Sequence, residues 1–450
     1  MKYVLFTVAL CGIVPLAIVC RLSRKLLAGL MTVMFLAVLA WDSSALNFFS
    51  FEFYRGTSRG LEISVVYLLA LAALLCVWLY GRFVRPFPDL GSWLYLVYFV
   101  ICVISVRQAV SFDVSNVWFD GGVVDLVTAN GTILAWCEVW KMAMMALVFY
   151  AVYTYLQFSQ DPMPIIKGLG LALIFCFMIV VKEHFVGCSQ AKGPFNHQNS
   201  LAMFALLITP IYLSAFLNCV KGPLWLFLTV AFVCGSGSLF RTYSRGAMAI
   251  YPLVSGFSAF LSFVRNFRLD MVRRLAPIAV VGFLGMLLLI PKIVNRFESA
   301  SEQSAGNRVK LARIALRMVF DKPWTGVGVN NWGTHMDLDG EYVQGEMKEN
   351  SIVETIYLLV AAECGIPGLL ALLAWFGYYW IVCFRLVKRL AGSKWFFLPT
   401  GILAGLSGCY IQSALEWVMK QQVNFMLMMV LFAMIAWMNR NWKTLRLERQ

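Results

Sequence analysis

Apolar runs recur along almost the whole chain and are separated by short polar connections. Each run holds about 16 to 22 residues, close to the length that a helix needs to cross a bilayer. The pattern predicts an all-α polytopic membrane protein with about twelve or thirteen transmembrane helices, at residues 3–20, 26–41, 61–81, 90–109, 132–157, 166–182, 200–218, 223–240, 246–264, 275–293, 366–384, 395–415 and 423–438. The first span leaves two topologies open. With it the chain has thirteen spans and an external N-terminus, and the alternative is twelve spans with both ends inside.

One long polar interval interrupts this pattern between Asn295 and residue 350, and it leads to a turn at Gly368. We therefore divide the chain into transmembrane helices at 1–294, a periplasmic loop with amphipathic and re-entrant helices at 295–365, transmembrane helices at 366–438 and a basic cytoplasmic tail at 439–450. Because the rest of the chain is membrane, we expect any chemistry on a hydrophilic substrate at or near this loop.

The first element of the loop is predicted to be an amphipathic helix, which Asn307 caps and Pro323 ends. Its apolar stripe should lie against the membrane surface and consists of Leu311, Ile314, Ala315 and Met318. Three basic residues form a solvated or headgroup-facing side: Lys310, Arg313 and Arg317. Arg308 instead falls beside the stripe, so it is the basic residue that we expect to point at a ligand.

Composition and charge exclude several classes of protein. Hydrophobic residues make up 61% of the chain and charged residues only 13%, which excludes a soluble domain. Apolar runs of this length also exclude an outer-membrane barrel, whose strands are about ten residues long. The formal charge is +14, but the Lys and Arg residues gather in connections on one side of the alternating spans, which indicates a cytoplasmic side rather than nucleic-acid binding. The twelve Cys form no CxxC pair and no Cys/His cluster, so we expect no metal site.

Polar side chains gather in the external connection KGPFNHQNSLAMF, at the start of the span at 200–218. Asn196, His197 and Asn199 could meet an anionic group there, together with the free N–H groups of the helix start. The alternative is that they only form a polar N-cap. Inside the span at 132–157, Glu138 and Lys141 stand three residues apart, and we interpret them as a structural ion pair.

Arg241 and Arg245 lie four residues apart in GSLFRTYSRGAMAI, at the external mouth of two spans. Arginines at that depth are costly unless something pairs with them, and no carboxylate lies within ten residues in the sequence. Either a distant acid or the phosphate of a ligand supplies the partner, since Arg suits bidentate contact with phosphate.

Taken together, three segments resemble the O-antigen ligase and O-antigen polymerase superfamily of bacterial inner-membrane glycan transferases. They are GPFNHQNSLAMF, YSRGAM, and NRVKLARIALRMVFDKPWTGVGVNNW followed by VETIYLLVAAECGIPG, and they cover about residues 193–370. The resemblance implies transfer of a glycan from undecaprenyl diphosphate to a glycan or glycolipid acceptor on the periplasmic face, without a metal or nucleotide cofactor. It also implies that Arg245 and Arg308 bind the diphosphate, and we predict that these two side chains line one external cavity. Membrane lipids are further partners, and no nucleic acid is expected.

The chain departs from the family at one position. Ligases of the family usually carry a His-Asn pair that begins nine residues before the position of Glu363, where this chain has Glu354 and Thr355. Glu354 could act as the general base that activates an acceptor hydroxyl, and His335 is a reserve base. Tyr357, three residues after Glu354, is a further candidate for substrate binding.

The departure leaves a ligase and a polymerase both open. A transporter or flippase of lipid-linked glycan and a non-catalytic component of an export complex are alternatives from other classes. The gathering of polar groups at one external face favours an enzyme over a transporter, which typically shows repeats or broken helices near the bilayer midplane. Pro323, Gly326 and Gly328 predict a hinge that would bring Arg308 and Glu354 to opposite ends of the scissile bond.

Overall fold

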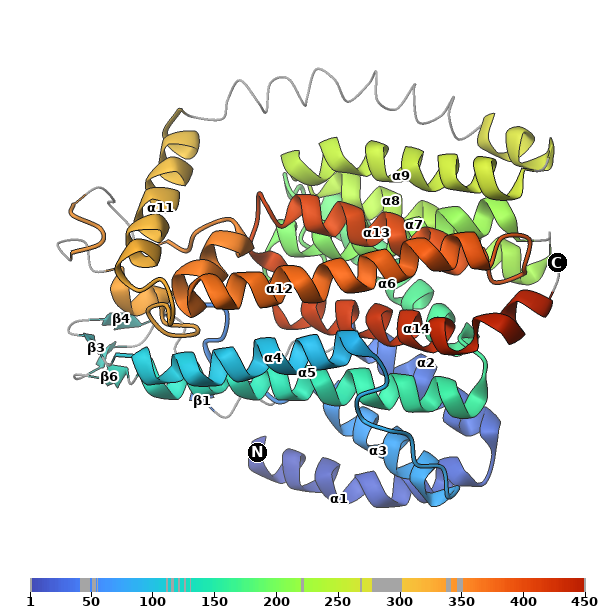
Figure 1. Ribbon diagram of the computed structural model, residues 1–450, viewed down its shortest axis with the longest axis horizontal. Helices are drawn as coiled ribbons and strands as arrows, with labels where there is room; N and C mark the ends of the chain where they lie inside the picture. Colours follow the sequence, from blue (N-terminus) through green and yellow to red (C-terminus); the bar gives the residue numbers. More distant parts are fainter. Residues whose placement is uncertain are drawn as a thin grey trace.

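The computed structural model describes residues 2–40, 49–50, 54, 56–110, 112–114, 117–119, 122–124, 127–129, 131–219, 222–267, 269–276, 302–336, 341–345 and 351–448. Its α-helices are α1 (Lys2–Arg21), α2 (Arg24–Ala40), α3 (Val65–Leu79), α4 (Leu90–Ser105), α5 (Gly131–Ser159), α6 (Met163–Phe185), α7 (Gln198–Asn218), α8 (Pro223–Arg241), α9 (Arg245–Asn266), α11 (Glu302–Asp321), α12 (Ile356–Arg389), α13 (Phe397–Gln412) and α14 (Gln422–Leu447). Short 3-10 helices are η2 (Val106–Gln108), η3 (Trp332–His335) and η4 (Val418–Lys420). Figure 1 shows most of the long helices side by side in one bundle, with α11 across one end.

The helices confirm the predicted multi-pass membrane architecture. Among the described residues, eight helices are long and apolar enough to cross a membrane. Two further apolar helices are shorter: Phe6–Arg21, within α1, and α3. The predicted span at 275–293 lies almost wholly outside the described residues. The strands are two or three residues long and form antiparallel pairs in the connections: β1 (Phe49–Ser50) with β2 (Gly60–Leu61), β3 (Phe112–Val114) with β6 (Val127–Ala129), and β4 (Val117–Phe119) with β5 (Gly122–Val124).

The centre of the bundle is α7, which is buried along its whole apolar length and packs closely against α13. Glycines on α13 allow this approach: a Cβ at Gly405 would lie 2.0 Å from the carbonyl oxygen of Leu207, and one at Gly401 would lie 2.3 Å from the Cα of Ile211. Small residues let helix backbones pack closely in membranes, where no hydrophobic effect drives association. Because later residues of α13 contact earlier residues of α7, the two helices are antiparallel, so the start of α7 meets the end of α13.

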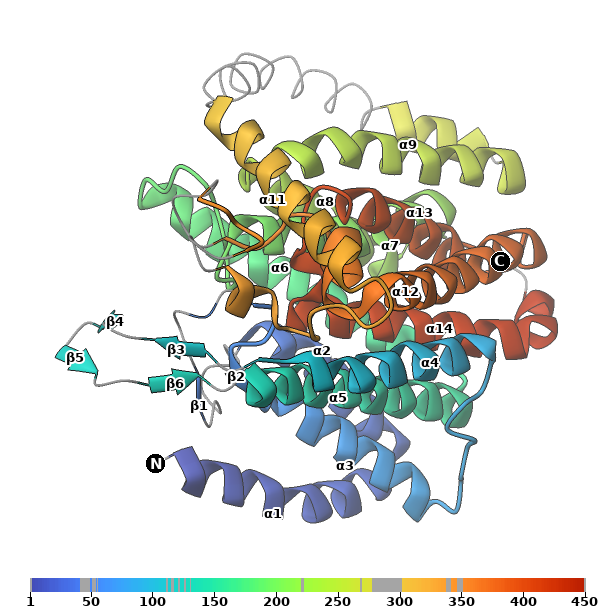
Figure 2. The ribbon, with the colours of Figure 1, turned by 60° about the vertical axis from the view of Figure 1, so that its left-hand side comes forward.

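Connections between helices gather at the two ends of the bundle. At the end where α11 lies, the backbone N–H of Thr57 donates to Asn330 Oδ1 (2.8 Å) and that of Ala191 donates to the Arg241 carbonyl (3.0 Å). At the far end of α12, Lys394 Nζ pairs with Glu448 Oε2 at 2.5 Å. This grouping follows the alternation that the sequence predicts. Figure 1 shows α11 and the strand pairs at the same end of the bundle, and Figure 2 shows the strands projecting from it. Which end faces the outside stays a prediction.

The amphipathic helix of the loop exists, but two details of its prediction are wrong. α11 begins at Glu302, so Asn307 lies inside the helix and does not cap it. The apolar stripe is buried against protein rather than membrane surface, because Leu311, Ile314, Ala315 and Met318 pack on a cluster that includes Val327, Trp332, Val353 and Leu359. Packing on the first part of α12 therefore fixes α11 in place.

The segment after α11 is a tightly packed turn, and the prediction of a hinge there is not supported. The N–H groups of Val327 and Gly328 donate to the carbonyls of Ala362 and Glu363, at 2.9 and 3.0 Å. Gly326 has a φ of +67°, and a Cβ there would lie 2.3 Å from the backbone of Glu363. Gly326 thus allows close approach to α12, which itself kinks at Gly365.

Candidate functional site

The site is built around Arg308, whose guanidinium contacts two carboxylates from different parts of the chain. Its Nε forms an ion pair with Glu354, which precedes α12, and its Nη2 lies 3.7 Å from Oε1 of Glu416. Glu416 belongs to the connection between α13 and α14. The side chains of Arg308, Glu354 and Glu416 are 41%, 35% and 12% exposed, so the cluster is open enough for a ligand to reach Arg308.

Helix packing brings the other polar groups to this cluster. Asn199 lies in the first turn of α7 and donates from Nδ2 to Oε1 of Glu416 at 2.7 Å. This contact follows from the antiparallel packing of α7 and α13. Arg245 is the first residue of α9, and the next residue, Gly246, lies against Gln412 at the end of α13. The start of α9 therefore reaches the same end of the bundle.

The charge of Arg245 acts on both carboxylates, because it lowers the pKa of Glu354 and of Glu416, as does the charge of Arg308. The charges of both arginines thus act on the same pair of acids, although 63 residues separate them in the sequence. That the two side chains line one cavity stays a prediction. Burial outweighs this effect and raises the pKa of Glu354 above its usual range. Burial, followed by the charge of Glu354, raises the pKa of Glu416 to about 7. Glu416 can therefore gain or lose a proton near neutral pH.

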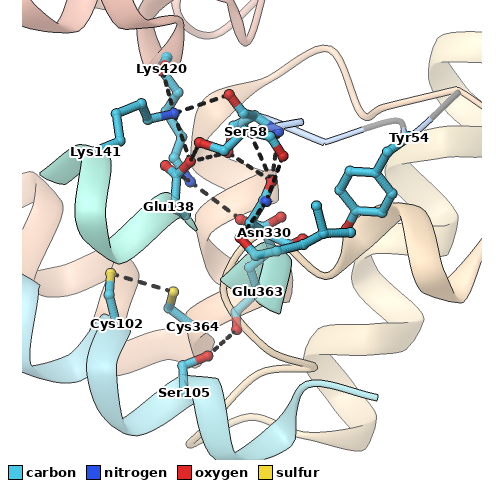
Figure 3. A network of polar contacts seen from close by, with 12 residues as sticks. Tyr54, Ser58, Cys102, Ser105, Glu138, Lys141, Asn330, Glu363, Cys364 and Lys420 are labelled. Atoms are coloured by element: carbon cyan, nitrogen blue, oxygen red, sulfur yellow. Dashed lines mark hydrogen bonds and ion pairs between the residues drawn. The ribbon is translucent and has the colours of Figure 1, made fainter. Parts of the chain in front are cut away.

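A second polar network lies deeper in the protein and anchors both sides of the site (Figure 3). Glu138 and Lys141 form the predicted ion pair at 2.6 Å. Lys420 lies 3.6 Å from Glu138 and 3.2 Å from Glu363, and all four side chains are almost fully buried. Lys420 follows Glu416 by four residues, and Glu363 follows Glu354 by nine. The network therefore holds the two chain segments that present the carboxylates.

The turn after α11 joins this network through Asn330. Its Nδ2 donates to the carbonyls of Ser58 and Leu134 at 2.8 and 2.9 Å, and its Oδ1 accepts from the backbone of Thr57 at 2.8 Å. Its carbonyl accepts from the hydroxyl of Tyr54. Because its amide and carbonyl are satisfied in this way, Asn330 fixes the turn relative to α5 and the connection before α3.

Two candidate residues from the sequence, Arg241 and His335, have their described contacts with groups other than Arg308, Glu354 and Glu416. Arg241 ends α8, and its guanidinium lies over the ring of Tyr243, 5.5 Å from the ring centroid. His335 ends η3 and contacts Tyr342 edge-on; burial and then Lys322 lower the pKa of its imidazole. The neighbours of His335 are at the C-terminal end of α11, about 20 Å along the helix axis from Arg308. None of the contacts described for His335 involves Glu354, and its role as a reserve base stays a prediction.

The remaining candidates have contacts outside the cluster. His197 is the N-cap of α7, because its Nδ1 accepts from the backbone N–H of Asn199 at 3.2 Å. Asn196 is exposed, and it makes no hydrogen bond to another described residue. The hydroxyl of Tyr357 donates to the carbonyl of Tyr410 at 2.8 Å and so ties α12 to α13. Roles for these residues in substrate binding stay predictions.

Glu416 is the member of the site that sequence reasoning missed. It is the only Asp or Glu between Glu363 and Glu448, and it stands in a short connection between two apolar runs. That isolation was a usable signal, but its partners Asn199 and Arg308 are 217 and 108 residues away. As for metals, the described residues hold no group of three or more His, Cys, Asp or Glu side chains placed to bind an ion.

Comparison with known proteins identifies the region that carries this site. No curated protein matches the chain. A family model described as O-Antigen ligase matches residues 230–373, which include Arg245, Arg308 and Glu354 but neither Asn199 nor Glu416. The family consists of enzymes of membrane glycan transfer, of the O-antigen ligase and polymerase type, and it implies lipid-linked glycan substrates. This multi-pass membrane protein thus carries, over residues 230–373, a domain of the O-antigen ligase family.

Proposed function

We propose that the protein moves a glycan from undecaprenyl diphosphate to an acceptor sugar hydroxyl on the periplasmic face of the bacterial inner membrane. The observation that carries this proposal is the contact of Arg308 with the carboxylate pair Glu354 and Glu416, on which the charge of Arg245 also acts. Two guanidinium groups offer the donors and the positive charge that a diphosphate needs. Two acids beside them offer a group that can accept a proton.

In this proposal the diphosphate replaces the carboxylates as the partner of Arg308. Glu354 and Glu416 hold the guanidinium in place while no donor is bound, and the arriving phosphate oxygens compete with them for it. Arg245 adds a second positive charge at the same place. Stabilising the negative charge on the departing diphosphate is then the work of the two arginines, a role that a metal ion fills in many other glycosyltransferases.

Displacement from Arg308 frees Glu354 to act as the general base. The acceptor hydroxyl oxygen attacks the anomeric carbon, its proton passes to the Glu354 carboxylate, and the bond between that carbon and the diphosphate oxygen breaks. The electron pair of that bond leaves with the diphosphate, which stays on Arg308 and Arg245. Glu416 is a positioning residue in this scheme, because it contacts Arg308 and Asn199 and carries the charge that the donor must overcome.

The proposal is tested by reconstituting the purified chain with an undecaprenyl-diphosphate oligosaccharide and measuring glycan transfer and lipid diphosphate release. Arg308→Gln and Arg245→Gln should lower turnover by about 100-fold or more, the range for loss of one oxyanion-stabilising group. The control is Arg313→Gln, because Arg313 is exposed on the same helix and should not affect turnover. Movement of intact donor across the bilayer without cleavage would refute the proposal and support a flippase.

A deletion strain separates the two reactions that the proposal allows. A polymerase predicts that lipid-linked repeat units accumulate unpolymerised, whereas a ligase predicts polymerised glycan that is not attached to its acceptor. Wild-type glycan in the deletion strain would contradict both.

A further inference from the structure

An open cleft of about 430 Å³ lies where α6 and α8 end, and no part of the reaction scheme above uses it. Its lining residues are His184, Gly187, Cys188, Ser189, Gln190, Arg241 and Tyr243. The volume falls within the range of about 300 to 1,000 Å³ that is usual for small-molecule sites. Two connections, the one after α6 and the one between α8 and α9, contribute both to the cleft and to the arginine–carboxylate cluster. The first leads to Asn199, and in the second Arg241 precedes Arg245 by four residues.

The positive charge of Arg241 has no acidic partner among the described residues. Its Nη1 donates to the hydroxyl of Tyr243 at 3.3 Å, while its Nε is buried and lacks a hydrogen-bond acceptor. A nearby acid, Glu183, accepts instead from the backbone N–H groups of Lys192 and Gly193, at 3.1 and 3.0 Å. An arginine that lines an open cleft and has no acidic partner among the described residues fits an anionic ligand.

Backbone strain holds the partner of Arg241 in position. Tyr243 has a φ of +49°, in the left-handed region that bulky residues rarely adopt. Thr242 supports this turn, because its hydroxyl donates to the carbonyl of Leu239 at 2.6 Å and accepts from the N–H of Ser244 at 3.2 Å. Strain that neighbouring contacts maintain is typical of ligand sites. Here it places the ring under the guanidinium of Arg241 and so orients that group.

We propose that the cleft binds a sugar residue that carries an anionic group, either a uronate carboxylate or a sugar phosphate. The inference rests on the proposed function, which assigns Arg245 and Arg308 to the diphosphate and leaves Arg241 for a second anion. Arg241 pairs with the anionic group, and the polar side chains of Ser189 and Gln190 meet sugar hydroxyls. The cleft thus favours glycans with acidic residues near the site of transfer.

Cys188 supplies a reporter for this cleft, because it is an exposed free cysteine in the lining. The purified full chain is treated with a maleimide, and the modification rate of Cys188 is followed by peptide mass spectrometry. The probes are trigalacturonate, its uncharged methyl ester, glucose 6-phosphate and inorganic pyrophosphate. We expect trigalacturonate or glucose 6-phosphate to slow the modification of Cys188 at least about fivefold, and the methyl ester to leave it unchanged.

Variants show whether Arg241 causes this protection. Arg241→Gln should abolish it, and Tyr243→Ala should weaken it more than Tyr243→Phe, which keeps the ring. Lys192→Gln removes a positive charge from the same connection but lies outside the lining, so protection should persist. Protection by pyrophosphate alone, or by none of the probes, would overturn the proposal. If the acidic sugars protect Cys188 but pyrophosphate does not bind at Arg308, the result would count against the proposed function and not against this cleft.

Discussion

We expect the charge of Glu416 to limit anion binding at the site near neutral pH. Burial and the neighbouring charge of Glu354 raise the pKa of Glu416 to about 7, despite the opposing effects of Arg308, Asn199 and Arg245. Above that pH the carboxylate is ionised and competes with phosphate for Arg308, which is 3.7 Å away. Below that pH it is protonated, and the competition ends. Anion binding should therefore tighten as the pH falls through about 7.

The size of the effect follows from the geometry of the cluster. A phosphate oxygen on the same guanidinium would lie on the order of 6 Å from Glu416, and two unit charges at that distance repel by about 3 kcal/mol at an effective dielectric constant of ~20. Solvent weakens this repulsion, since the Arg308 side chain is 41% exposed. We expect about 1–2 kcal/mol to remain, which is about a 5- to 30-fold change in Kd.

Titration calorimetry with inorganic pyrophosphate tests this value on the purified wild type and Glu416→Gln. At pH 8 the variant should bind about 5- to 30-fold more tightly, and the two proteins should converge by about pH 6. Protonation of pyrophosphate itself cancels in the ratio of the two Kd values at each pH. Glu448→Gln is the control, because Glu448 pairs with Lys394 at the other end of the bundle and should leave binding unchanged. Equal binding at pH 8, or an advantage that persists unchanged at pH 6, would refute the reasoning.

Three further outcomes are expected. Glu354→Gln should retain pyrophosphate binding but lower glycan transfer by about 100-fold or more, and near-normal transfer would remove Glu354 as the base. Gly326→Ala should lower the Tm in detergent far more than Gly345→Ala, because both have positive φ but only Gly326 packs against backbone; equal losses would contradict the packed turn. Lys420→Met should destabilise the protein by about 3–5 kcal/mol in a denaturant titration, since it leaves Glu138 and Glu363 buried without that cation, and an unchanged midpoint would argue against the network.

The succession of helices could be predicted from the sequence, because a membrane span is a local property of about 20 consecutive apolar residues. The amphipathic helix was equally local: Leu311 and Ile314 already showed which face of α11 would be buried. The start of this helix could not be predicted in the same way, since Asn307 has the chemistry of a cap but the chain enters the helix five residues earlier. Helix ends depend on few residues and are therefore less certain than helix interiors.

The partners of charged side chains could be predicted only where they are close in sequence. Glu138 and Lys141 share one helix face, so their ion pair followed from spacing alone. Arg241 and Arg245 were marked by the cost of an arginine near lipid, but the sequence left open whether a distant acid or a ligand would pair with them. Arg308 was marked by its place beside the apolar stripe of α11. The tertiary structure brought two distant acids, Glu354 and Glu416, into contact with Arg308.

Glu416 and the turn at Gly326 show why the rest required the fold. Glu416 reaches Asn199 because glycines on α13 let that helix pack closely against the antiparallel α7. No local sequence pattern encodes this packing. Gly326 has the composition of a hinge, yet contacts with the backbone of Glu363 make it part of a fixed turn. Spacing along the chain fixes which residues share a helix face, whereas helix packing alone decides which distant charges meet and which glycines are free to move.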